Sequence, residues 1–381
     1  MGVMRRSRKG EGSGAKANPA LRLGKTREQL SIASPAGRSQ PPGMFARRVM
    51  AMGLAVLMLG SAPAGAWDYE RHRLVNALAL ASLPRDFPAF ARTAKATERI
   101  LFLGGEPDRW RNQRDRALRH FNNPDHYFDV EYLVPYRITP NTLTHFRYEF
   151  VGRMAAARVA LKLPPTTGNA DRLKGHPGFL PWAINEHYLK LVSAFSYLKV
   201  FEELGTPEEI ANARANVVYR MGLLSHFVGD ASQPLHTTKH FNGWTGTNPK
   251  GYTTSKRFHS WIDGGFFNAT TDPTVRALRP RLRAARLLER PATREDASGQ
   301  FQAALAYIMA QHRQVEPLYQ MDKAGKLSPK TPREGQAFLH AQLLKGSQML
   351  GDLWLTAWRE AKPDTFLKGY LNRRKLEGTK K

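Results

Sequence analysis

Three residues that can bind a metal ion lie close together in the segment SHFVGDASQPLH, residues 225–236. His226 and Asp230 are four residues apart, which places both side chains on one face of a helix. Pro234 ends that helix just before His236, so the three side chains converge on one helix end. Imidazole nitrogen and carboxylate oxygen are the ligands that zinc takes where no thiolate is present, and this chain has no cysteine.

A second pair of the same kind follows in FHSWID, where His259 and Asp263 repeat the four-residue spacing. One such pair alone is more often a hydrogen bond on a helix surface than a metal site. Two pairs and the QPLH turn, all within 38 residues, instead favour a metal cluster.

A third segment with ligand-type residues, 104–132, contains two prolines and is predicted to be a loop. Acidic and imidazole side chains on a loop beside a metal cluster are plausible ligands. Their types and spacing alone do not choose among the candidates, which are Asp108, Asp115, His120, Asp125, His126 and Asp129.

The amino-terminal part of the chain has the composition of a leader rather than a fold. Residues 1–43 are rich in Arg, Gly, Ser and Pro and are predicted to be disordered, or an upstream extension with Met44 as the start. Residues 44–66 resemble a signal peptide cleaved after Ala66, with two arginines, a short apolar run and small residues before the cut: Arg47, Arg48, 49–59, Ala64 and Ala66. We therefore expect an exported protein, periplasmic or extracellular. The apolar run is short for a retained anchor, so we expect no stable membrane insertion after cleavage.

Cleavage after Ala66 would make Trp67 the first residue. Its amino group and carbonyl oxygen would then form a chelating pair, and His72 follows five residues later. The alternative is that Trp67 is a core aromatic and His72 a solvated residue of the first helical turn.

Apolar residues recur at helical spacing from Trp67 onward, and no alternating strand pattern interrupts them. We predict an all-α fold, one compact multi-helix domain over 67–364, followed by a basic tail, 365–381, that is solvated or frayed. After a first helix before Pro84, helices are predicted at 141–163, 183–204, 208–229, 255–267, 276–290, 296–322 and 333–361.

The 381-residue chain carries a formal charge of +26, and 41% of its residues are hydrophobic. Residues 1–66 hold 11 Lys/Arg and 2 Asp/Glu, which leaves 47 against 30 and a charge of +17 for the rest. The apolar content is enough for a substantial core and excludes a wholly disordered protein. The charge indicates either general solubility or a polyanionic partner such as nucleic acid or an anionic membrane.

The ordered set of candidates resembles the S1/P1 nuclease family, an all-helical group that shares a trinuclear zinc fold with bacterial zinc-dependent phospholipase C. HFVGDASQPLH is similar to the family motif HFxGDxxQPLH, HYFD at 126–129 is similar to a second motif, and leader cleavage directly before a Trp is a third likeness. The chain departs from the family at its start, WDYERH instead of WGxxGH, and in the loop after His236, which lacks the usual Asp and GGN.

The resemblance implies three zinc ions. The first would be bound by Asp108, His126, His226 and Asp230. The second would be bound by His236, His259 and Asp263. The third would be bound by the amino and carbonyl groups of Trp67, by His72 and by the other oxygen of Asp230, which thus bridges two ions.

The resemblance also implies an exported, zinc-dependent phosphodiesterase that cleaves single-stranded DNA or RNA to 5′-nucleotides. A 3′-nucleotidase activity is a possible addition, and no protein partner is implied. Asp108 and Asp230 would hold the catalytic ions, Arg111 would brace the phosphoryl oxygens, Tyr127 would stack on a base, and Asp129 would bond the base edge. The alternatives are a phospholipase C-type lipid phosphodiesterase and, further off, a non-catalytic basic protein with structural zinc.

Overall fold

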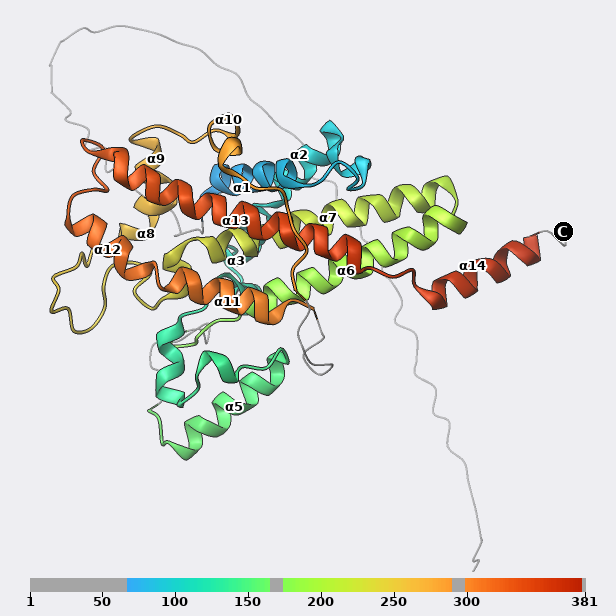
Figure 1. Ribbon diagram of the computed structural model, residues 1–381. Coiled ribbons are helices and arrows are strands. Elements are labelled where there is room, and N and C mark those ends of the chain that lie inside the picture. Colours follow the sequence, from blue (N-terminus) through green and yellow to red (C-terminus); the bar gives the residue numbers. More distant parts are fainter. Residues whose placement is uncertain (1–66, 165–173, 290–298, 379–381) are drawn as a thin grey trace, which may run out of the picture. The chain divides into compact units, whose positions relative to one another are not determined.

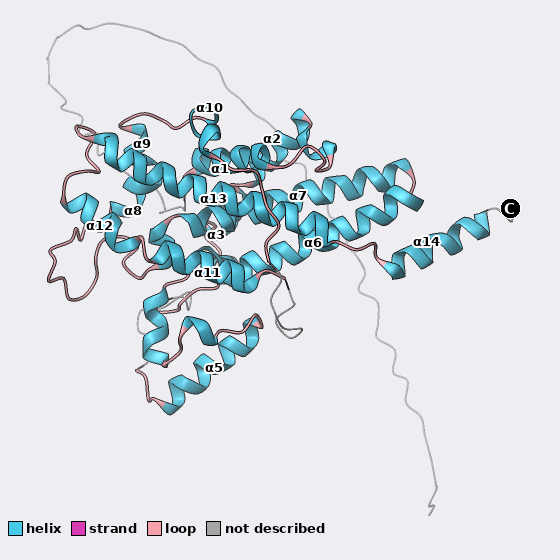
Figure 2. Ribbon diagram, viewed as in Figure 1, coloured by secondary structure: helices cyan, strands magenta, loops and turns pink. Residues whose placement is uncertain are grey.

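A computed structural model describes residues 67–164, 174–289 and 299–378. Its regular structure is helical throughout these residues, and β pairing is limited there to two isolated bridges, Phe128 with Gly178 and Phe241 with Gly243 (Figure 2). The all-α prediction is therefore confirmed. The predicted leader, 1–66, lies outside the described residues. Among the residues described, no helix is long and apolar enough to cross a membrane.

Two long neighbouring helices form the centre of the fold (Figure 1). α6 (Leu180–Leu204) and α7 (Pro207–Ser232) are joined by only two residues and pack along each other. α13 (Pro332–Glu360) packs against both of them, and α1 (Tyr69–Ser82) packs on α13. The remaining α-helices are shorter or peripheral: α2 (Ala94–Leu103), α3 (Glu106–Arg111), α4 (Arg116–Asn122), α5 (Arg147–Ala160), α8 (Phe258–Ser260), α9 (Phe266–Asn268), α10 (Val275–Leu278), α11 (Phe301–His312), α12 (Val315–Lys323) and α14 (Thr365–Gly378).

The sequence of α7 sets both of its ends. Thr206 accepts from the backbone N–H of Glu209 and Glu209 accepts from that of Thr206, a capping box, while Pro207 occupies the first turn, where a missing N–H costs nothing. At the other end Gln233 caps the helix before Pro234, which cannot continue it. The helix that ends before QPLH is thus confirmed.

α13 presents a long stripe of buried apolar side chains to the core. Leu339, Leu343, Leu350 and Trp354 recur at spacings of four and seven residues and are all 0% exposed. Burying each leucine contributes about 2 kcal/mol, before the cost of ordering the chain. This stripe lies against α1, α6 and α7, so the four helices form one core.

The segment 104–132, predicted to be a loop, is largely helical. Pro107 lies in the first turn of α3, and the Asp115 side chain caps α4 by accepting from the Leu118 N–H at 2.8 Å. A proline at a helix start is compatible with the helix, so its presence does not indicate a loop. Short 3₁₀ turns follow, among them η2 (Asn123–His126).

The predicted helix over 276–290 is wrong beyond its first turn. A 3₁₀ turn that contains Pro280, η7 (Arg279–Arg281), follows α10, and residues 282–289 after it form no regular structure and bond to α1 and α13. There the N–H groups of Arg286 and Leu288 donate to Asp352 and Thr356, at 2.8 and 3.0 Å. Side chains of α13 therefore satisfy backbone groups that a helix would satisfy internally.

Two other predicted segments differ in detail. The helix predicted over 296–322 is broken between α11 and α12. The tail predicted to be solvated or frayed forms α14, where Arg374 pairs with Glu209 at 2.6 Å and Lys368 with Glu203 at 2.7 Å. Two basic residues of the tail thus bind acidic residues of α6 and α7.

Candidate metal centre

α7 supplies the two residues at the centre of the cluster. His226 and Asp230 are both fully buried, and the Nε2 of His226 lies 3.3 Å from Oδ2 of Asp230. Gly229, between them, faces the ring of His72, because a Cβ there would lie 2.6 Å from His72 Nδ1. The glycine of the HFVGD motif therefore lets α1 bring an imidazole against α7.

Four ligand-type atoms surround one point beside α7. His126 Nδ1 lies 2.9 Å from both His226 Nε2 and Asp230 Oδ2, and Asp108 Oδ1 lies 3.8 Å from each of the two imidazole nitrogens. Ligands about 2.0–2.1 Å from a tetrahedral ion are about 3.3 Å from one another. The atoms of His126, His226 and Asp230 therefore have about the spacing that one such ion requires, and Asp108 lies somewhat farther from both imidazoles.

A second set lies at the end of α7 and in the segment α8 to α9. His236 Nε2 is 3.1 Å from His259 Nε2, which is 3.2 Å from Asp263 Oδ2. Asp263 lies in a single π-helical turn, η6 (Trp261–Gly265), so the helix predicted over 255–267 begins only at Phe258 and is α-helical only in the short pieces α8 and α9 on either side of that turn. Such turns occur often at functional sites. The three buried side chains offer one ion three ligands and leave a fourth position open.

His72 brings a third group of ligand atoms to the cluster. Its Nε2 lies 3.3 Å from Asp230 Oδ1, and neither buried atom has a hydrogen-bond partner among the described residues. Unpaired buried nitrogen and oxygen atoms that face one another fit a shared cation. Trp67, five residues before His72, is fully buried, and its indole N–H donates to Ser232 Oγ at 2.6 Å. Ligation by the Trp67 amino group stays a prediction, because it requires cleavage before this residue.

Backbone carbonyls hold three of the imidazole rings. The Nδ1–H of His226 donates to Gly104 O at 2.6 Å, that of His236 to His126 O at 2.5 Å, and that of His259 to Phe241 O at 3.2 Å. A donor at Nδ1 fixes the tautomer that leaves Nε2 free to bind a cation. Each carbonyl thus orients a ring as metal sites require.

The pKa shifts of Asp230 and His126 suit ligation. Burial raises the pKa of Asp230, but the charges of His226 and His236 outweigh it and hold the pKa well below its usual range. Burial, with the charge of Arg111, lowers the pKa of His126 to about 3. A charged carboxylate and a neutral imidazole are the forms that bind metals. Burial raises the pKa of Asp263 well above its usual range, so a cation there would displace a proton.

A pocket of about 360 Å³ opens beside the second set. His236 and His259 form one wall of it, and Arg111, Tyr127 and Asp129 line the rest. The structure therefore brings the three residues predicted to contact substrate into one cavity with two candidate ligands. Their predicted roles are not decided by this placement.

Two of these residues have distinctive surroundings. Asp129 is 5% exposed, its Oδ1 has no partner among the described residues, and burial together with Glu131 raises its pKa well above the usual range. Tyr127 packs against Gly178, whose φ of +90° and whose Cβ position, 2.1 Å from Tyr127 O, only glycine allows. The Arg111 Nε donates to Asp108 Oδ1 at 2.6 Å.

The structure separates the remaining candidates of segment 104–132. Asp115 and His120 lie on exposed α4, and Asp125 pairs with Arg147. Of the six candidates from that segment, only Asp108, His126 and Asp129 belong to a possible ligand group or line the pocket.

Other residues at the site were not identified in the sequence. Gln233 donates to Asp263 Oδ1 at 2.9 Å and accepts from the Leu235 N–H at 2.7 Å, so the glutamine of QPLH holds a candidate ligand. Its place in the motif was the only signal. Lys174, His176 and Phe241 line the pocket, and nothing in their spacing indicates this.

Comparison with known proteins adds no identification. No family model matches the chain, and no curated protein matches it.

Proposed function

We propose that this chain is a zinc-dependent phosphodiesterase of the S1/P1 nuclease type, which hydrolyses single-stranded DNA or RNA. The observation that carries the proposal is the shared wall of the pocket. His236 and His259, two candidate ligands, line the same cavity as Arg111 and the unpartnered carboxylate of Asp129. A hydrolytic metal site needs an open position that faces a substrate cavity, and candidate ligands that line a cavity support such a site.

Three zinc ions would be held as the resemblance implies. The first would take Asp108, His126, His226 and Asp230, the second His236, His259 and Asp263, and the third Trp67, His72 and Asp230. When bound, such ions supply a deprotonated water near neutral pH and positive charge for the leaving oxygen. Imidazole and carboxylate ligands without thiolate support zinc, although other transition metals share this preference.

The residues of the chain have separate tasks in the proposed reaction. Arg111, 8% exposed and fixed by Asp108, would donate to phosphoryl oxygens as their charge develops. Tyr127 would stack on a base. Any base can make this contact, and the bases of a single strand are accessible to it. Asp129 would bond the edge of that base, because its Oδ1 has no other partner among the described residues.

A phospholipase C-type activity is the second candidate, and one observation favours it. Tyr127, Tyr132 and Phe241 line the pocket around Asp129, and rings beside a carboxylate are a suitable surface for a quaternary ammonium head group. Burial, which raises the pKa of Asp129, disfavours its charged form and so weakens this candidate. The strongly basic chain also favours a polyanionic substrate.

The test is hydrolysis by protein that begins at Trp67. Single-stranded DNA and phosphatidylcholine are assayed on one preparation, with and without a chelator, after its zinc content is measured. Chelator-sensitive cleavage of DNA alone supports the proposal, and cleavage of lipid alone moves the protein to the second candidate. Cleavage of neither substrate by zinc-loaded protein contradicts both and leaves the non-catalytic basic protein.

A further inference from the structure

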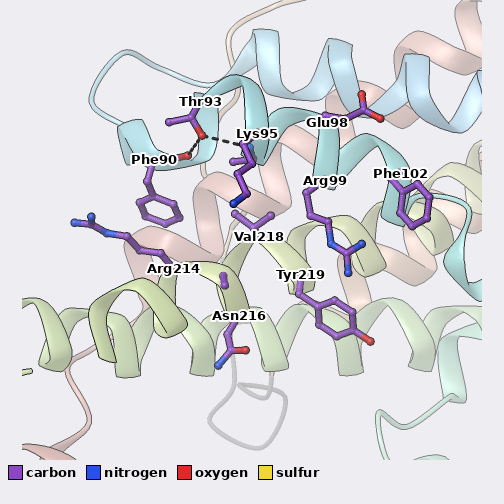
Figure 3. Close-up of a pocket in the computed structure, with 12 residues that line it drawn as sticks. Phe90, Thr93, Lys95, Glu98, Arg99, Phe102, Arg214, Asn216, Val218 and Tyr219 are labelled. Carbon is purple, nitrogen blue, oxygen red and sulfur yellow. Dashed lines mark hydrogen bonds between the residues drawn. The ribbon is translucent and has the colours of Figure 1, made fainter. Parts of the chain in front are cut away.

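A groove separate from the pocket beside His236 lies between α2 and α7, with a volume of about 780 Å³ (Figure 3). Its walls combine rings and aliphatic side chains with basic residues. Arg99 from α2 and Tyr219 from α7 extend into the space between the two helices. The residues that carry the inference are Phe90, Lys95, Arg99, Phe102, Arg214 and Tyr219.

The groove is positively charged at its mouth. Lys95 and Arg99 are exposed and lie one helical turn apart, and neither forms an ion pair within the described parts of the chain. Glu98, the acidic residue between them, is already bound by Arg73 at 2.8 Å. Arg214 pairs with Glu202 on the surface, where such a pair is weak and exchanges readily.

Each ring of the groove has a cation beside it. The guanidinium carbon of Arg99 lies 5.6 Å from the ring centre of Phe102, and that of Arg214 lies 5.5 Å from the ring centre of Phe90. Arginine side chains interleaved with partly exposed rings are the composition of surfaces that bind single-stranded nucleic acid, where bases stack and phosphates meet the cations.

The cations are spread along the groove instead of gathered at one end. Arg214 lies beside Phe90, which precedes α2, whereas Arg99 lies beside Phe102 near the end of α2 (Figure 3). A lipid with one charged head group needs cations at only one end of a groove, whereas a polynucleotide carries a negative charge at every nucleotide. The distribution therefore fits a polyanionic strand better than an acyl lipid.

The position of the groove relates it to the metal centre. Tyr219 precedes His226 by seven residues of α7, two helical turns, so both lie on one face of that helix. The groove residues of α7, 214–219, are ~10–18 Å from His226 along the helix axis. That span is longer than the single nucleotide by which a dinucleotide extends from its scissile phosphate, so only a longer strand could contact both the centre and the groove.

We propose that the groove between α2 and α7 binds single-stranded nucleic acid away from the point of cleavage. The contribution of the groove to catalysis rests on the proposed function, but binding of nucleic acid to the groove can be measured without cleavage. The groove would raise affinity for long substrates without touching the reacting phosphate.

Binding is measured first, with zinc-loaded protein and a fluorescent phosphorothioate oligothymidylate of about 20 nucleotides, which resists cleavage. We expect the double variant Lys95→Gln/Arg99→Gln to lower the dependence of log affinity on log salt by about 0.7 for each charge removed. Tyr219→Ala should weaken binding about ten-fold. The controls are Arg276→Gln/Arg279→Gln, which removes two exposed charges on and just after α10, and Phe366→Ala, which removes a ring that is 79% exposed on α14.

Cleavage is measured second, on a dinucleotide and on a cleavable oligothymidylate of about 20 nucleotides, the length used for binding. The groove variants should raise KM for the long substrate and leave kcat/KM for the dinucleotide unchanged. Wild-type affinity in both groove variants would overturn the proposal. So would loss of binding to phosphatidylglycerol vesicles with oligonucleotide binding unchanged, which would assign the groove to lipid. If the protein cleaves nothing but the groove variants lose oligonucleotide affinity, the groove stands and the proposed nuclease function fails.

Discussion

Asp230→Asn tests the metal centre most directly. Both oxygens of Asp230 face candidate ligands: Oδ2 lies 2.9 Å from His126 and 3.3 Å from His226, and Oδ1 lies 3.3 Å from His72. Asparagine keeps the size and shape of the side chain. It removes the negative charge and replaces one ligand oxygen with an NH₂ group that cannot bind a cation.

The expected loss follows from the charge removed. A unit charge about 4 Å from another contributes about 4 kcal/mol at the effective dielectric of a protein, which corresponds to roughly 10³-fold in affinity. Because Asp230 faces two sets, both should lose their ions, while His236, His259 and Asp263 should keep theirs. We expect the zinc content to fall from three ions to one per chain and the nuclease rate to fall at least 10³-fold.

Zinc is counted by mass spectrometry of the metal, and the rate is measured on single-stranded DNA. Asp115→Asn is the matched control, because Asp115 caps α4 outside the cluster and asparagine caps a helix equally well. This control should retain three zinc ions and the full rate. A folded Asp230→Asn protein with three zinc ions and the wild-type rate would refute the assignment of Asp230 as the bridge.

Three further changes test other parts of the structure. Zinc removal by a chelator should lower the thermal midpoint, since an ion that binds only the folded state at 1,000 times its Kd contributes about 4 kcal/mol; an unchanged midpoint in circular dichroism would contradict this. Arg111→Lys should keep all zinc but lower kcat about 10²-fold, because lysine loses the planar donor pair; a wild-type kcat would rule out the role of Arg111. For His187, burial lowers the pKa from 6.5 to about 3. The unfolded chain therefore binds the extra proton between these values, and stability should fall by about 1.4 kcal/mol per pH unit as pH drops below 6.5. His187→Phe should flatten this slope in urea unfolding of zinc-loaded protein, and an equally steep slope in the variant would disprove the cause.

The long helices and the clustering of the candidate ligands could be predicted because local signals determine them. Pro207 and Pro234 bound α7, and the four-residue spacing of His226 and Asp230 fixes their common face. The choice of Asp108 over Asp115 rested on the resemblance alone, and the structure supports it by placing Asp108 in the cluster.

What the sequence did not predict depends on contacts between distant residues. The segment after η7 is not helical, because α13 supplies Asp352 and Thr356 as partners for its backbone N–H groups, and no local pattern encodes this. α14 carries Arg374, which pairs with Glu209 on a helix 165 residues away in the chain. The groove between α2 and α7 was missed for the same reason, because its two walls are more than a hundred residues apart.

The unusual start of the chain, WDYERH, illustrates how such contacts replace a local motif. Asp68 and Arg71 stand where the S1/P1 nuclease motif WGxxGH has glycines. Asp68 caps α1 and pairs with Arg71 at 2.8 Å. Arg71 is 3% exposed and also donates to Asn268 at 3.0 Å and to Asp272, which ties the helix start to the segment after Asp263. These bonds restrict the orientation of the first turn, which glycines would leave free. The charged residues therefore do not argue against a third metal site, because they fix α1 in the place where His72 faces Asp230.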